Sequence, residues 1–398
     1  MQSSRKFITI VTFIITSQVV RMILESYYTN QIDVDDITII ERTLTGVSES
    51  LAADQYVVRH FYKSEGFPIN DVTPYDITLV LHGSVDKLYK LIEIAEVWDG
   101  PVSMSVLAPD SDAAFVDDAI DGVRLCWNRL RHTTSFHLVF PSRAPPNMTS
   151  LGSFVYLSCK DVIRRLRIRK PRSSTSMYPH NVMRNVARRG ALTNYVLHVD
   201  ADVTPSKGLR QRFLEFARRN SLHENLRSSH DVYVLPVFEV RRSSYPVRTK
   251  RELLTALEDK NARVLLQEIC PQCHKATDSD RWLRSITFSP ADEMSISYEV
   301  QCTKGWEPYF IASRYSPLYG INFTAYGQDR LSHMCELQAK GYKFKVLNDE
   351  FLVYDGYRSK AKITQQEKRR KDESRKFHEM FAANLRRFGY TNEAYNKC

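Results

Sequence analysis

Two aspartates separated by one residue follow an apolar run near the middle of the chain, Tyr195-Val-Leu-His-Val-Asp200-Ala-Asp202. The run predicts a buried strand over 194–199, and side chains at positions i and i+2 of an extended segment lie on one face. Two such carboxylates can bind a divalent cation, which neutralises a diphosphate leaving group, as transfer from a nucleotide sugar requires. Aspartates after a strand also cap helices or tighten turns, so the spacing alone leaves both interpretations open.

The segments around this pair alternate between strands and helices. Short apolar runs predict strands at 76–82, 102–107, 194–199 and 232–240. Periodic apolar positions predict helices at 85–98 (with Ser84 as N-cap), 113–120, 183–189 and 209–219. This alternation indicates an α/β domain with a parallel sheet and right-handed crossovers. Ligands bind at the carboxyl ends of the strands in such a sheet, which is where the aspartate pair lies.

The N-terminus begins with a basic pair, Arg5 and Lys6, followed by an apolar segment at 7–24. A short apolar segment behind basic residues is typical of a signal anchor or a cleaved signal peptide, and we favour an anchor with residues 1–6 in the cytosol. Both alternatives direct the remaining chain into the secretory pathway.

Residues 25–72 are polar and mixed and predict a stem, followed by one globular domain over 73–390. Two glycosylation sequons, at Asn147 and Asn322, and seven cysteines agree with an oxidising lumen. The net charge is +10, with basic clusters at 164–172 and 358–388. Such clusters can bind polyanions or form solvated helix faces. The chain shows no nucleic-acid-binding motif, so we expect no nucleic-acid partner.

Several further segments occur in a characteristic order along the chain. They are Tyr178-Pro-His-Asn-Val-Met-Arg184-Asn185-Val-Ala, Tyr195 to Ser206, Phe238-Glu-Val-Arg241-Arg242, Arg281-Trp282, Trp306-Glu307-Pro308-Tyr309, Tyr326-Gly327 with Arg330, and Leu347 to Val353. Over 75–390 the chain thereby resembles glycosyltransferase family 49. The resemblance implies a GT-A (Rossmann-like) fold, a single-pass type II Golgi membrane topology with a lumenal catalytic domain, and a manganese-dependent UDP-sugar donor. It also implies inversion at the anomeric carbon, with glucuronic acid the first candidate sugar and a glycoprotein glycan as acceptor.

The resemblance also assigns roles to individual residues. Asp200 and Asp202 would hold the metal, and Asp200 would also contact the donor. Arg184 and Asn185 would face the nucleotide, since an arginine fork suits anionic groups; the alternative is packing on a helix surface. Arg358 matches a basic position near the diphosphate, or else belongs to the solvated C-terminal cluster.

An inverting transferase needs a carboxylate that removes the proton of the acceptor hydroxyl. Asp329, which follows a Gly-containing segment, is the first candidate, and Glu307 is the second. The alternative for either acid is an ion pair with a nearby arginine.

One position departs from the family pattern. Where the family carries a histidine that acts as a third metal ligand, this chain has Tyr354, and a neutral phenol is a poor ligand. Three explanations are open: Asp355 turns into the site, the aspartate pair and the donor hold the metal alone, or catalysis is weak or lost. In the last case the chain would act as a glycan-binding or scaffold protein.

The segment Cys270-Pro-Gln-Cys273-His274 has the spacing of half a zinc site or of a redox pair. No second CxxC accompanies it. The resemblance implies a lumenal disulfide here, while the pairing of the other cysteines stays open.

Overall fold

The computed structural model describes residues 48–51, 55–63, 73–143, 146, 154, 156–171, 178–242, 245–285, 293–321, 329–358 and 379. The predicted tail and anchor, both sequons, and most of the predicted stem and of the C-terminal basic cluster lie outside these residues. Within the described residues, no helix combines the length and apolar character needed to cross a membrane.

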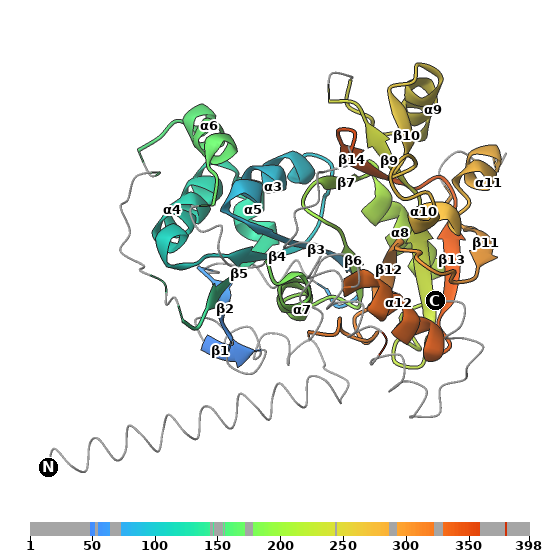
Figure 1. Ribbon diagram of the computed structural model, residues 1–398, viewed down its shortest axis with the longest axis horizontal. Helices are drawn as coiled ribbons and strands as arrows, with labels where there is room; N and C mark the ends of the chain where they lie inside the picture. The colour runs from blue at the N-terminus through green and yellow to red at the C-terminus, as the bar shows by residue number, and fades with distance from the viewer. Residues whose placement is uncertain are drawn as a thin grey trace, which may run out of the picture.

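A large mixed sheet runs through the molecule (Figure 1). Its strands, in spatial order, are β1 (Ser48–Leu51), β2 (Tyr56–Tyr62), β5 (Thr134–Pro141), β4 (Val102–Leu107), β3 (Ile77–Ser84), β6 (Tyr195–His198), β12 (Tyr309–Ser313), β8 (Asp231–Leu235), β13 (Lys343–Leu347) and β11 (Ile296–Val300). The strands β5, β4, β3 and β6 are parallel, as the alternation predicts. The four predicted strands, which correspond to β3, β4, β6 and β8, all run in one direction, but the sheet as a whole is mixed because β12, which was not predicted, lies antiparallel between β6 and β8.

A second, smaller sheet contains β10 (Ala262–Val264), β9 (Val237–Val240), β14 (Leu352–Asp355) and β7 (Val203–Pro205) in that order. The predicted strand at 232–240 is divided between the two sheets as β8 and β9. Pro236 separates the two parts, and proline has no amide hydrogen with which to continue a ladder. The chain therefore passes from the large sheet into the small sheet at Pro236.

The helices are η2 (Val85–Lys87), α3 (Leu88–Ala95), α4 (Asp110–Cys126), α5 (Asn128–Thr133), α6 (Cys159–Ile168), α7 (His180–Arg189), α8 (Leu209–Arg219), α9 (Lys250–Glu258), α10 (Gln272–Lys275), α11 (Ser279–Arg284) and α12 (Asp329–Ala339). The predicted helix at 209–219 is confirmed, and those at 113–120 and 183–189 lie within longer helices. The helix predicted at 85–98 begins with a 3-10 turn and ends at Ala95. Ser84 is extended but makes no cap, since its hydroxyl bonds Asp86 at 2.5 Å.

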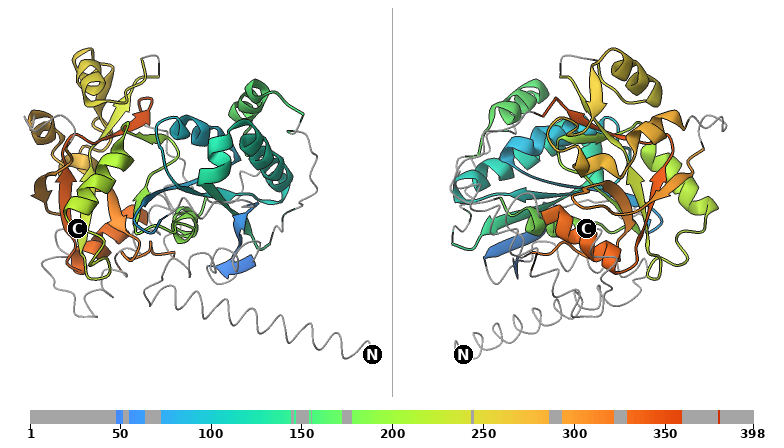
Figure 2. Two further views of the ribbon diagram at one scale, coloured as in Figure 1. Left: turned by 180° about the vertical axis from the view of Figure 1, so that it is seen from behind. Right: turned by 45° about the vertical axis from the view of Figure 1, so that its right-hand side comes forward.

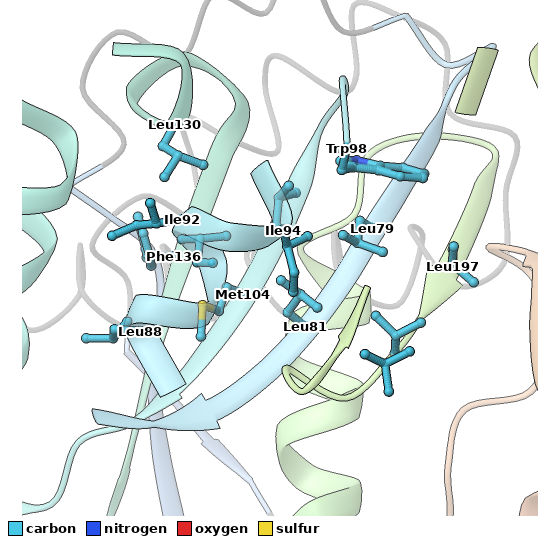
Figure 3. Packing of buried hydrophobic residues seen from close by; sticks show 14 of the residues in the cluster. Leu79, Leu81, Leu88, Ile92, Ile94, Trp98, Met104, Leu130, Phe136 and Leu197 are labelled. Carbon is cyan, nitrogen blue, oxygen red and sulfur yellow. The ribbon is translucent and has the colours of Figure 1, made fainter. Parts of the chain in front are cut away.

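The two faces of β3 bury different helices. Leu79 and Leu81 are fully buried in one core with Leu88, Ile92 and Ile94 of α3 (Figure 3). Residues of α4 belong to the same core, while Val80 packs on Ala187 of α7 on the other face. Figure 2 shows α7 and the α3–α4 layer on opposite sides of these strands. This sandwich holds the carboxyl ends of β3 and β6 in place, and the site lies there.

Candidate functional site

A cavity of about 230 Å³ opens at the carboxyl ends of β3 and β6. Its lining residues are His82, Gly83, Ser84, Lys87, Tyr178, His180, Arg184, Asp200, Ala201, Asp202, Leu265, Leu266, His274, Glu307, Tyr309, Asp329, Arg330 and Arg358. Every predicted site residue except Asn185 lines this cavity. Segments far apart in the sequence therefore meet at the strand edge that the α/β pattern predicts.

Asp200 receives cationic and neutral donors. Arg330 donates to its Oδ1 at 2.7 Å, the hydroxyl of Tyr309 donates to its Oδ2 at 2.8 Å, and His82 Nε2 lies 3.4 Å from Oδ1. Burial by itself raises the pKa of a carboxylate, but Arg330 and His82 outweigh burial and hold the pKa of Asp200 well below its usual range. Asp200 is therefore ionised throughout the physiological range.

Asp202 has a separate cation. The ammonium of Lys87 donates to its two carboxylate oxygens, at 2.9 and 3.1 Å. The aspartate pair follows a strand as predicted, but the expectation that it lies in an extended segment is wrong, because β6 ends at His198 and the amide of Val203 donates to the carbonyl oxygen of Asp200 at 2.9 Å to close a turn. Both carboxylates still face the cavity.

Tyr354, where the family pattern has a histidine, stacks against Arg358. The guanidinium of Arg358 lies 4.5 Å from the ring centroid of Tyr354. Asp355 does not turn into the cavity, since its carboxylate bonds Lys90 at 2.6 Å. The explanation in which Asp355 turns into the site in place of the family's histidine is therefore not what the structure shows.

A divalent metal needs several hard oxygen ligands around it. In the part of the chain that the structure describes, no three His, Cys, Asp or Glu residues form a metal-binding group. Asp200 and Asp202 nevertheless provide two hard oxygen donors on one cavity, and ions such as Mg²⁺ typically bind one or two carboxylates and take other ligands from phosphates and water. The two carboxylates would thus suit a divalent metal whose remaining ligands are diphosphate oxygens and water.

Asp329 forms a buried ion pair with Arg184, and each side chain is about 96–97% buried. Arg184 also donates to Asn181 Oδ1 at 2.8 Å. Burial by itself raises the pKa of Asp329, but the charges of Arg184 and His180 lower it by more, so that the pKa is about 2. A carboxylate with so low a pKa is a weak base, so the structure favours the ion-pair alternative for Asp329.

Glu307 has the opposite electrostatic environment. Burial raises its pKa from 4.5 to about 7, with Arg330 opposing and Asp329 adding to the rise. None of the described residues makes an ion pair or a hydrogen bond with its carboxylate. A base is most effective when its pKa lies near the working pH. Of the two acids, Glu307 therefore has the pKa that better suits a base.

Asn185 lies outside the cavity lining and is nearly fully buried. Its amide donates to the carbonyl of Tyr319 at 2.8 Å, and its Oδ1 accepts the N–H of Tyr319 at 2.9 Å. This two-way bond joins α7 to the loop before α12. The structure supports the packing alternative for Asn185.

Sequence reasoning assigned no role to Lys87, His82 or Tyr309 and considered His274 only as part of a possible zinc half-site, yet all four line the cavity. Lys87 and His82 lie just after or at the end of a predicted strand, and the rule that ligands bind there would have indicated them. Tyr309 lies within a matching segment. His274 follows the Cys270–Cys273 disulfide, which rules out a zinc half-site because the two sulfurs are bonded to each other. A second disulfide joins Cys126 to Cys159.

Comparison with known proteins assigns the family. A family model described as a glycosyl-transferase for dystroglycan matches residues 76–388. The chain belongs to glycosyltransferase family 49. It is 31% identical over 324 residues to beta-1,4-glucuronyltransferase 1 of Mus musculus, covering 79% of this chain and 76% of that protein. It is 28% identical over 283 residues to the xylosyl- and glucuronyltransferase LARGE2 of Mus musculus, covering 71% of this chain and 34% of that protein.

Among solved structures, GalNAc-T7 with UDP, GalNAc and Mn²⁺ aligns with a TM-score of 0.38 and 9% identity, over 75% of this chain and 47% of that one. A likeness of this size is too low to assign a fold or a ligand. The family membership of this glycosyltransferase rests on its sequence.

Proposed function

We propose that this glycosyltransferase has a GT-A fold and transfers a sugar, glucuronic acid being the first candidate, from a UDP-sugar to a glycan on a glycoprotein, with inversion. The names of its relatives include glucuronyl transfer, and the family model names dystroglycan. The observation that carries the proposal is one cavity that contains both the Asp200–Asp202 pair and Glu307, a carboxyl group with a pKa of about 7.

The chemistry can be assigned to the chain's own residues. Glu307 removes the proton of the acceptor hydroxyl while the hydroxyl oxygen attacks the anomeric carbon. The bond from that carbon to the diphosphate oxygen breaks on the opposite side. Arg358 and Lys87 line the same cavity and supply positive charge for the departing UDP. A divalent metal, Mn²⁺ by family resemblance, would be held by Asp200 and Asp202 and would neutralise the diphosphate.

We further propose that residues 7–24 anchor the chain in the Golgi membrane with the catalytic domain in the lumen. The basic pair before this segment, the sequons and the two disulfides support that topology. Protease protection of a C-terminal tag in intact vesicles tests it. A tag that is digested without detergent would contradict lumenal placement.

A panel of UDP-sugars with Mn²⁺ and glycan acceptors, assayed with the purified full-length chain, tests the activity. We expect turnover with UDP-glucuronate and its loss in Asp202→Asn, with Asp231→Asn on β8, away from the cavity lining, as a matched control. Absence of both hydrolysis and transfer with every UDP-sugar would contradict an active enzyme.

The stacked Tyr354–Arg358 pair favours one other candidate, a family member that binds glycans without turnover. Calorimetric titration of UDP with and without Mn²⁺ separates the two. The enzyme predicts metal-dependent UDP binding that Asp202→Ala abolishes. A scaffold predicts glycan binding that this substitution leaves unchanged.

A further inference from the structure

Residues 265–274 form one wall of the cavity, to which Leu265, Leu266 and His274 contribute. The segment leads from β10 into α10, which has only four residues. A single helical turn is not stable by itself, because the cost of nucleation exceeds the gain from its few hydrogen bonds. The Cys270–Cys273 disulfide closes this turn immediately before His274.

Glu307 is attached to the same turn through its backbone. Its N–H donates to the carbonyl oxygen of Cys273 at 2.8 Å, and the N–H of Cys273 donates to the carbonyl oxygen of Cys270 at 2.9 Å. Cys273 is 8% exposed, so these bonds are protected from competition with water. Covalent and hydrogen bonds thus connect the disulfide directly to the backbone of Glu307.

The two disulfides differ in what they can stabilise. Cys270 and Cys273 are three residues apart, whereas Cys126 and Cys159 are 33 apart. The entropy that a disulfide removes from the unfolded chain grows with the length of the loop it closes. The smaller ring therefore contributes less to global stability, and its main effect is on the local geometry of the cavity wall.

We propose that the Cys270–Cys273 disulfide is a positioning element for catalysis, which holds the turn that fixes the backbone of Glu307 and keeps His274 in the cavity wall. The inference rests on the proposed function, because Glu307 acts as a base only if the chain transfers a sugar. His274 is 6% exposed and lines the same cavity as Glu307, so an opened turn would admit water through this wall of the cavity.

Opening the disulfide has a specific electrostatic consequence. Burial is the largest cause of the raised pKa of Glu307, so hydration returns that pKa toward 4.5 and makes the carboxylate a weaker base. The cations Lys87 and Arg358 belong to other segments and remain in place. The structure thus predicts an effect on kcat and on its pH dependence, with donor binding little changed.

The test compares two double variants of the full-length chain with the wild type. In Cys270→Ser/Cys273→Ser we expect kcat to fall about 10- to 100-fold and the ascending limb of the kcat/KM pH profile to move to lower pH. The Kd of UDP should stay within about twofold. In the matched control, Cys126→Ser/Cys159→Ser, we expect a lower Tm with the limb in its wild-type position.

A wild-type limb and kcat in Cys270→Ser/Cys273→Ser would overturn the proposal, as would equal effects of the two double variants. If the first variant does not fold, the folded wild type is treated with dithiothreitol. Dithiothreitol reduces the protein disulfide to two thiols by thiol–disulfide exchange and is itself oxidised to a cyclic disulfide. Alkylation and mass spectrometry then report which pair has opened. Loss of activity must follow opening of Cys270–Cys273, and loss that follows Cys126–Cys159 instead contradicts the proposal.

These outcomes are distinct from a failure of the proposed function. A wild-type chain that transfers from no UDP-sugar removes the proposed function itself. A wild-type chain that is active, beside an unchanged Cys270→Ser/Cys273→Ser variant, removes only the positioning role.

Discussion

Replacing Glu307 by glutamine should affect activity and stability in opposite directions. Glutamine has nearly the shape of a protonated carboxyl group but cannot accept the proton of the acceptor. We therefore expect kcat to fall by about 10²–10⁴-fold, as is typical for loss of a general base. In the wild type, kcat/KM should rise with pH through about 7, the pKa of Glu307, and this limb should be absent in Glu307→Gln.

The stability effect follows from the same pKa. Folding raises the pKa of Glu307 from 4.5 to about 7, so the folded state binds the proton more tightly than the unfolded state. The resulting stability is complete below pH 4.5, decreases as the pH rises toward 7, and is absent above it. At about 1.4 kcal/mol per pH unit, the loss has an upper bound of about 3 kcal/mol.

Glu307→Gln removes this loss, because its side chain is neutral at every pH. The free energy of unfolding of the variant, relative to the wild type, should therefore increase by up to about 3 kcal/mol between pH 4.5 and pH 8. Urea denaturation at several pH values measures it, with Glu299→Gln, at an exposed position on β11, as the matched control. A stability difference that does not change with pH, or an ascending limb that persists in Glu307→Gln, would refute the reasoning.

Two further predictions concern the ion pairs of the cavity. Asp329→Asn leaves Arg184 buried without its partner, so we expect the free energy of unfolding to fall by about 3–5 kcal/mol in urea titrations at pH 7, while the ascending limb near pH 7 persists. Because the pKa of Asp329 is depressed to about 2, its stabilising effect is present above its unfolded pKa and is lost as the pH falls toward 2. If the free energy of unfolding of Asp329→Asn decreased at acidic pH just as that of the wild type does, this assignment would be contradicted. Lys87→Met removes the ammonium that bonds both carboxylate oxygens of Asp202. If this ion pair is worth about 1 kcal/mol, the affinity for Mn²⁺, measured by electron paramagnetic resonance, should rise about fivefold. Lys90→Met, which affects other carboxylates, should leave the affinity unchanged, and equal effects of the two variants would count against direct competition at Asp202.

The sequence by itself determined the family, the α/β class and the position of the aspartate pair after a central strand. Each depends on local information, namely apolar periodicity and short ordered segments that a linear pattern records. The helix at 209–219 and the strand at 102–107 have the predicted bounds for this reason. The disulfide at Cys270 and Cys273 agrees with what the family resemblance implied.

Only the tertiary structure decided which acid suits the role of base. Asp329 and Glu307 are both carboxylates near an arginine-rich site, and nothing in their local sequence separates them. Arg184 reaches Asp329 across 145 residues and depresses its pKa, while Glu307 is half-buried, its carboxylate has no ion pair or hydrogen bond among the described residues, and its pKa rises. A pKa depends on burial and on charges nearby in space, and these are properties of the folded chain.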